Sequence, residues 1–249
     1  MHTILYEYTG IWVLMGLAKL EDIHPSLWLG SQLAHAAGQV IDTGYETLSA
    51  ELPGGGWPVS TLIELLVQRT GIGEMRVLRP ALASLKRPIA LVKPPQIPQS
   101  AGFAYQGVGV EKLIWLKPQS TADALWSVEQ ILRAGSFGAV IFWQQHIRSE
   151  SLRRLMLAAQ SAETLFFLHR PVADALNSSP ATLRLAVRPA ENGVSVEIVK
   201  RKGPAAAGPI VIRTDPMPAL LSPHARARRS QLREVLGYGN DLVDANVLP

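Results

Sequence analysis

A short glycine-containing loop between a buried strand and a helix constrains this chain most strongly. Residues 61–67 (TLIELLV) form an apolar run of strand length, Gly71 and Gly73 follow, and a helical pattern begins at Glu74. A strand, a glycine loop and a helix in this order are typical of a phosphate-binding loop, whose backbone N–H groups hold an anion at the helix N-terminus. The pattern therefore predicts an α/β fold with this loop at the end of a strand.

The loop lacks the two side chains that nucleotide chemistry requires. A phosphate-binding loop carries a Lys that reaches the terminal phosphates and a Ser or Thr that binds magnesium. This chain has Glu74 and Met75 at the corresponding positions. Because a carboxylate repels a triphosphate, we expect a degenerate loop at Gly71, Gly73, Glu74 and Met75 that binds no nucleotide, and we expect no cofactor and no catalysis.

Strand and helix patterns alternate between residues 61 and 168. The expected strands cover 61–67, 88–92, 112–116, 138–143 and 164–168. The expected helices begin at Glu74, Ser120 and Ser149. Such alternation predicts a mostly parallel sheet flanked by helices. Two alternating runs at 181–187 and 194–199 predict an antiparallel hairpin that extends this sheet.

The expected core, 59–203, lies between two segments of different composition. Residues 15–58 are expected to form a helical segment, with helices at 24–37 and 43–52, that ends in a Gly/Pro hinge at 52–58. Residues 204–249 are expected to form a flexible basic tail. The candidates for partner binding in this tail are Arg226, Arg228, Arg229, Leu232, Arg233 and Leu236. The alternative is a tail that only keeps the protein soluble.

Composition limits the classes of function. The 249 residues include no Cys, which excludes disulfides and thiolate chemistry. A net charge of +4 is compatible with nucleic acid or an acidic partner. No apolar run reaches the roughly 18 residues of a membrane span, and Glu7 precedes the apolar stretch 11–18 where a secretory signal would have basic residues. We expect a cytoplasmic protein with no membrane contact.

Two further sets of residues have less specific interpretations. Trp57 is expected in the core, beneath the hinge, with an exposed recognition role as the alternative. No metal site is expected, because the histidines have no second ligand at a suitable spacing. These histidines are His24, His35, His146 and His224.

Six blocks of the sequence together resemble a known family. They are 24–30, 52–66, 71–82, 113–143, 166–171 and 194–204. Over about residues 15–204, the chain resembles the RecA core, and specifically the ImuA family of RecA-like accessory proteins from bacterial mutagenesis cassettes. The resemblance implies a RecA-like core with the hairpin at its C-terminal end. It also places His169 and Arg170 near a nucleotide-sensing position, although both could simply pack against a loop at a strand end.

The resemblance further implies that the ATPase chemistry is lost. The Lys and Thr of a RecA-type ATPase fall on Glu74 and Met75, its catalytic Glu falls near Pro95, and its magnesium-binding Asp falls near Trp143. Pro cannot act as a general base, and neither Met nor Trp binds magnesium. Loss at three separate elements indicates a pseudo-ATPase.

The function implied by the family is that of a non-catalytic adaptor in SOS-induced translesion DNA synthesis, a mutagenic form of DNA repair. The implied partners are an ImuB-like Y-family polymerase homologue, RecA, and indirectly the error-prone DNA polymerase III alpha subunit. A direct DNA contact is left open. The implied location is cytoplasmic, with nucleoid association when DNA is damaged.

Two alternatives stay open at this point. The SulA family of cell-division inhibitors, which bind FtsZ, is similar over roughly residues 60–190, and an active recombinase or other ATPase is the third possibility. A separate hypothesis concerns residues 1–14. Leu5–Gly10 back-translates to a sequence that resembles the operator of the SOS repressor, so Met15 would be the true start.

Overall fold

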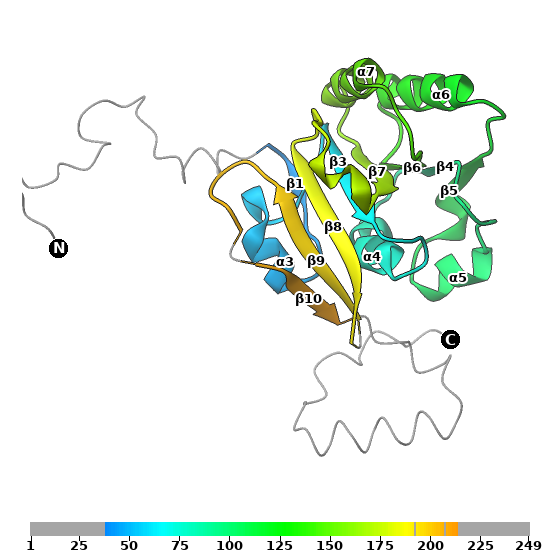
Figure 1. The fold of residues 1–249 in the computed structure, drawn as a ribbon. Coiled ribbons are helices and arrows are strands. Elements are labelled where there is room, and N and C mark those ends of the chain that lie inside the picture. Colours follow the sequence, from blue (N-terminus) through cyan, green and yellow to red (C-terminus); the bar gives the residue numbers. More distant parts are fainter. Residues whose placement is uncertain (1–37, 192, 207, 214–249) are drawn as a thin grey trace, which may run out of the picture.

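The computed structural model describes residues 38–191, 193–206 and 208–213, and its centre is one eight-stranded sheet (Figure 1). The strand order is β10-β9-β8-β3-β7-β6-β4-β5. The strands are β3 (Thr61–Val67), β4 (Ile89–Val92), β5 (Leu113–Leu116), β6 (Ala139–Trp143), β7 (Leu165–Pro171), β8 (Leu183–Ala190), β9 (Gly193–Lys200) and β10 (Ile210–Arg213). The strands from β8 to β5 run parallel, whereas β9 and β10 are antiparallel. The predicted parallel sheet and antiparallel hairpin are confirmed.

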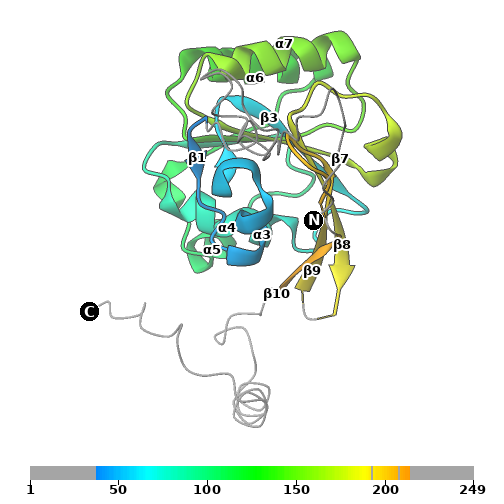
Figure 2. The same ribbon diagram turned by 90° about the vertical axis from the view of Figure 1, so that its left-hand side faces the viewer.

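Helices cover both faces of this sheet (Figures 1 and 2). The helices are α3 (Glu46–Glu51), α4 (Glu74–Ser84), α5 (Ser100–Tyr105), α6 (Thr121–Ala134) and α7 (Ser149–Gln160), and single 3-10 turns are η1 (Pro53–Gly55), η2 (Val110–Lys112) and η3 (Val172–Leu176). α3, α4 and α5 pack on one face and α6 and α7 on the other. Alternate residues of β3 therefore enter two separate cores, because Ile63 and Leu65 point to the α4 side and Leu62 to the α6 side.

The local sequence determines where helix α6 begins and ends. The Ser120 side chain accepts a hydrogen bond from the Asp123 backbone N–H at 3.0 Å, and Gly135 ends the helix with φ +64°. Between these caps, Ala124, Val128 and Leu132 form a fully buried stripe at helical spacing. The cap at Ser120 and the glycine at 135 were predicted from the sequence. The predicted stripe was Leu125, Val128 and Leu132, but Leu125 is only partly buried and Ala124 takes its place in the core.

The predicted Gly/Pro hinge at 52–58 is a packed turn that leads into the core. The predicted helix at 43–52 is α3, and η1 follows it directly. The short strands β1 (Val40–Ile41) and β2 (Trp57–Pro58) then pair antiparallel. Trp57 is fully buried and meets Phe167 edge-to-face, with ring centroids 5.3 Å apart. The core role predicted for Trp57 is therefore confirmed, and its exposed alternative is wrong.

The predicted flexible tail begins too early at residue 204. Residues 210–213 (IVIR) form β10, which pairs with β9 along its free edge, and Ile212 is buried against the main core. The predicted N-terminal segment 1–14, the helix at 24–37 and the tail candidates from Arg226 to Leu236 lie outside the described residues.

Candidate functional site

The loop between β3 and α4 has the backbone of an anion-binding turn. It leaves the carboxyl end of β3, and Gly71 and Gly73 adopt φ +85° and +116°. These positive φ values favour glycine, which explains why the sequence has glycine at both positions. Gly73 is also the N-cap of α4, so the N–H groups of the loop are close to the positive end of that helix.

The side chain of Glu74 fills the position where such a loop would hold an anion. Its Oε1 accepts a hydrogen bond from the Gly71 N–H at 2.7 Å, and its Oε2 accepts one from the Gly73 N–H at 3.1 Å. Glu74 is buried, with 3% of its surface exposed. The chain therefore supplies its own carboxylate to the N–H groups that a phosphate would otherwise use.

The other positions of interest carry apolar or unreactive groups. Met75 and Trp143 both pack against the core on the α4 side of the sheet. Pro95 lies exposed in the segment that follows β4. Neither the Met75 nor the Trp143 side chain has an oxygen atom that could bind a magnesium ion. Met75 and Trp143 thus place apolar groups, and no magnesium-binding side chains, at these two positions.

His169 is a buried, neutral imidazole beside Trp143. Its ring stacks on the Trp143 ring with centroids 4.9 Å apart, and only 3% of the residue is exposed. Neither ring nitrogen has a hydrogen-bond partner among the described residues. Burial lowers the pKa of His169 from 6.5 to about 3. This environment agrees with the packing interpretation of His169.

A buried charge network, whose centre at Glu64 the sequence did not predict, crosses the opposite face of the sheet. Glu64 lies in the middle of β3 and is fully buried. Its Oε1 lies 3.2 Å from Arg170 Nη1 on β7, and its Oε2 lies 2.7 Å from Arg184 Nε on β8. Ser179 Oγ also donates to Oε1 at 2.7 Å. Every oxygen of Glu64 is thus paired, as a buried carboxylate requires.

The same network holds the segment after β7 in place. Arg184 donates to the carbonyl oxygens of Asp174, Ala175 and Asn177, at distances of 2.7 to 3.1 Å. Asp174 Oδ2 forms an ion pair with Arg170 Nη2 at 3.1 Å but accepts no hydrogen bond of good geometry from the described residues. Asp174 Oδ1 accepts from Asn177 Nδ2 at 2.7 Å. These contacts therefore hold residues 174–177, which follow β7, against the sheet through buried charged groups.

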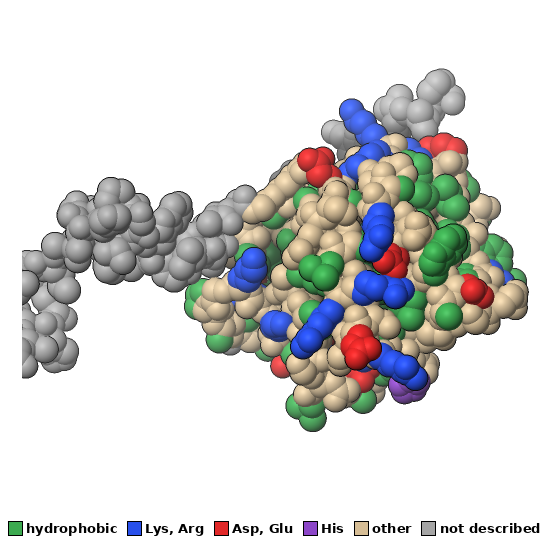
Figure 3. All heavy atoms as spheres, turned by 90° about the horizontal axis from the view of Figure 1, so that it is seen from above, with side chains coloured by type: hydrophobic (Ala, Val, Ile, Leu, Met, Phe, Trp, Pro, Cys, Tyr) green, Lys and Arg blue, Asp and Glu red, His purple; other side chains and the backbone are tan. Residues whose placement is uncertain are grey.

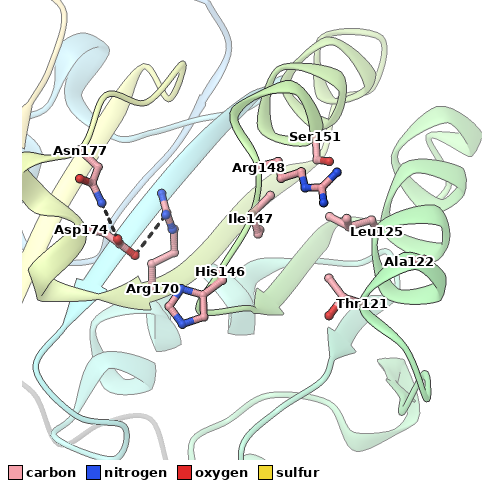
Figure 4. Close-up of a pocket in the computed structure, with 10 residues that line it drawn as sticks. All are labelled: Thr121, Ala122, Leu125, His146, Ile147, Arg148, Ser151, Arg170, Asp174 and Asn177. Atoms are coloured by element: carbon pink, nitrogen blue, oxygen red, sulfur yellow. Dashed lines mark hydrogen bonds and ion pairs between the residues drawn. The ribbon is translucent and has the colours of Figure 1, made fainter.

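A pocket of about 700 Å³ opens beside this network (Figure 4). It lies between the first turns of α6 and α7, the segment before α7, and the segment after β7. The pocket is lined by Thr121, Ala122, Leu125, His146, Ile147, Arg148, Ser151, Arg170, Asp174 and Asn177. Figure 4 shows Arg148 and Leu125 on one side and Arg170 and Asp174 on the other. The pocket combines cationic, polar and apolar walls.

The outer face of α6 and α7 carries charges of both signs. Lys and Arg side chains are spread over this face, with Asp and Glu side chains between them (Figure 3). Glu129 of α6, for example, pairs with Arg133 at 2.7 Å and with Arg154 of α7 at 2.8 Å. These pairs join the two helices and neutralise part of the surface, so no uniform basic patch defines a partner site there.

Within residues 38–213, apart from the two gaps, no three His, Asp or Glu side chains come together in a way that could hold a metal ion. None of the helices in this part of the chain has the length and apolar character needed to cross a membrane. Compared with known proteins, the sequence matches no family model and no curated protein.

Proposed function

We propose that this protein is a non-catalytic, RecA-like adaptor of SOS-induced translesion DNA synthesis. The observation that carries the proposal is the occupation of the loop by Glu74, whose carboxylate takes the N–H groups of Gly71 and Gly73. A γ-phosphate would have to displace a buried carboxylate and then lie beside a negative charge. Both effects oppose nucleotide binding.

The surroundings of the loop support the same proposal. A nucleotide-hydrolysing site needs magnesium ligands and a general base near the phosphates. Met75 and Trp143 pack into the apolar core instead, and the imidazole of His169 is stacked on Trp143. A single substitution such as Glu74→Lys would therefore leave the magnesium ligands and the base still missing.

The topology supports a RecA-like core. The strand that carries the loop, β3, lies inside a parallel sheet between β7 and β8, and an antiparallel pair completes one side. The segments that carry the family resemblance include β3, α4, β6, β7 and β9. They form the framework of one sheet and the helix that follows the loop.

The proposed mechanism is assembly. A surface of the core contacts an ImuB-like polymerase homologue or RecA, and the tail beyond the described residues provides a second contact through its basic and apolar side chains. Two modest contacts on one chain raise the overall affinity, because the second contact forms at a high effective concentration. The error-prone DNA polymerase III alpha subunit is reached indirectly, through the ImuB-like partner. In the cell, the protein is cytoplasmic and associates with the nucleoid when DNA is damaged.

The test is capture of purified partners by the full-length chain. An ImuB-like protein, RecA and FtsZ are each offered to wild type and to two tail variants. One variant changes Arg226, Arg228, Arg229 and Arg233 to Gln, and the other changes Leu232 and Leu236 to Ala. Substitution is preferable to a deletion from residue 204, because such a deletion would remove β10 from the sheet.

We expect capture of the ImuB-like protein or RecA by wild type and weaker capture by both tail variants. Capture that is unchanged in both variants would remove the tail from the mechanism. Capture of FtsZ alone would contradict the adaptor proposal and favour a SulA-like division inhibitor.

A further inference from the structure

We propose that the pocket between α6, α7 and the segment after β7 binds a small ligand with a phosphate or carboxylate group on an apolar body. The pocket lies on the α6–α7 face of the sheet, whereas the Glu74 loop leads into α4 on the other face (Figure 1). The inference therefore does not rest on the proposed loss of nucleotide binding.

The first turn of α7 leaves hydrogen-bond donors without an acceptor. Arg148 is the N-cap of α7, and no side chain caps this helix in the described part of the chain. The first helical bond runs from the Leu152 N–H to the Arg148 carbonyl oxygen. The backbone N–H groups of Ser149, Glu150 and Ser151 therefore have no acceptor within the helix. Ser151 also lines the pocket. An oxyanion is a suitable acceptor for such groups.

A buried cation provides a second and independent observation. Arg170 lines the pocket with only 6% of its surface exposed, and its Nε has no hydrogen-bond partner among the described residues. Its other two nitrogens contact Glu64 and Asp174. The Nε atom is itself buried, so Arg170 would act on an anion in the pocket through the charge of its guanidinium and not through a hydrogen bond.

The balance of charge in the pocket favours an anion. Arg170 and Arg184 together balance Glu64 and Asp174 within the buried network. Arg148 has no carboxylate partner in the described structure and adds a positive charge to the same pocket. The positive end of the α7 dipole adds to its effect.

The shape and the remaining walls restrict the ligand further. A volume of about 700 Å³ is that of a small-molecule site. Ala122, Leu125 and Ile147 form an apolar wall, and Thr121 and Asn177 add neutral polar groups. A bare anion would leave this apolar wall in contact with water, so an anion on an apolar body fits better.

The experiment titrates the full-length protein with inorganic phosphate, phenyl phosphate and benzoate and follows backbone amide signals by NMR. We expect saturable shifts at Ser149 and Ser151, with tighter binding of phenyl phosphate than of inorganic phosphate. The comparison of phenyl phosphate with benzoate identifies whether a phosphate or a carboxylate is preferred.

Two variants on one helix make the test specific. Arg148→Gln should weaken binding about fivefold to tenfold, because it removes a charged donor at a partly hydrated site. Arg153→Gln changes the same charge on an exposed part of α7 outside the pocket and should leave binding unchanged. Arg148→Lys should retain most of the affinity.

Absence of saturable shifts with all three probes would overturn the inference. Equal weakening by Arg148→Gln and Arg153→Gln would do the same, because it would indicate a general response to charge. Shifts confined to Gly71 and Gly73 would instead place the anion at the Glu74 loop and would contradict the proposed function.

Discussion

At the scale of single residues, Glu74 offers the most direct perturbation of the loop. Glu74→Gln keeps the shape of the side chain but removes the charge that receives the N–H groups of Gly71 and Gly73. We expect the free energy of unfolding to fall by about 1.5–3 kcal/mol, the range for hydrogen bonds to a charged group. Urea unfolding measures the change. Glu150→Gln, in the exposed first turn of α7, is the matched control and should have a smaller effect. Equal effects would show that the loop contacts contribute little.

His169 gives the protein a specific sensitivity to acid. Its pKa is about 3 in the folded state against 6.5 for the free side chain. Between these values the unfolded chain binds a proton that the folded chain excludes, so stability falls as the pH falls. Lowering the pH from 7 to 5 should reduce the free energy of unfolding by about 2 kcal/mol through this group alone.

The test for His169 compares the pH dependence of urea unfolding between variants. His169→Phe retains an aromatic ring beside Trp143 and cannot be protonated, so it should lose this part of the dependence. His146→Phe, at an exposed position, should behave as wild type. An unchanged pH dependence in His169→Phe would contradict the role of burial at this site.

Some of these residue roles could be read from the sequence, whereas others could not. The sequence itself shows that Glu74 and Met75 stand where a phosphate-binding loop has Lys and Ser or Thr. The sequence does not show that the Glu74 carboxylate accepts hydrogen bonds from two N–H groups of the loop. This contact depends on the direction of the side chain in the first turn of α4, which the spacing of residues along the chain does not determine. Glu64 was missed because it lies within an apolar run, although a charge inside such a run indicates a buried partner. Those partners, Arg170 and Arg184, come from strands more than 100 residues away.

At the scale of elements, β10 is the strand whose role most needs a test. Ile212 is buried, whereas Val211 in the same strand is 55% exposed. Ile212→Ala should lower the free energy of unfolding by about 2–4 kcal/mol, because it leaves a cavity in the core. Val211→Ala should change it by less than about 1 kcal/mol. Thermal and urea unfolding of both variants distinguish a sheet strand from a tail, since a tail would tolerate both changes equally.

The buried network that joins β3, β7 and β8 provides a second test at this scale. Glu64→Gln leaves Arg170 and Arg184 buried without their carboxylate, which should cost about 3–5 kcal/mol in the free energy of unfolding. The matched control is Glu197→Gln, which breaks the exposed pair with Arg188 between β8 and β9. The control should cost no more than about 1 kcal/mol. Similar losses in both variants would contradict a structural role for the network.

The elements themselves were largely predictable, because their patterns are local. The cap at Ser120, the glycine at 135 and the apolar stripe between them define α6 without reference to the rest of the chain. β10 was not predictable in this way. It follows a Pro- and Gly-rich stretch typical of a tail, and it becomes a strand because β9 offers an unpaired edge. Such long-range pairing is not recorded in the local sequence.

At the scale of the whole molecule, the parallel sheet separates two sites of different kinds. On the α4 side, the chain's own carboxylate accepts the N–H groups of the loop, and apolar side chains pack nearby. On the α6–α7 side, a pocket remains open beside a buried charge network. The sequence predicted the class of fold and the position of the glycine loop between β3 and α4. It did not predict the pocket, whose walls come from three separate segments of the chain.

Calorimetric titration of the full-length protein with ATP in the presence of Mg²⁺ tests whether the loop at Glu74 excludes nucleotide. We expect no saturable heat of binding and no release of phosphate on prolonged incubation, because Glu74 occupies the loop and the apolar Met75 stands where a magnesium-binding Ser or Thr would be. Saturable, Mg²⁺-dependent binding that Glu74→Gln alters, or measurable turnover of ATP, would contradict the account.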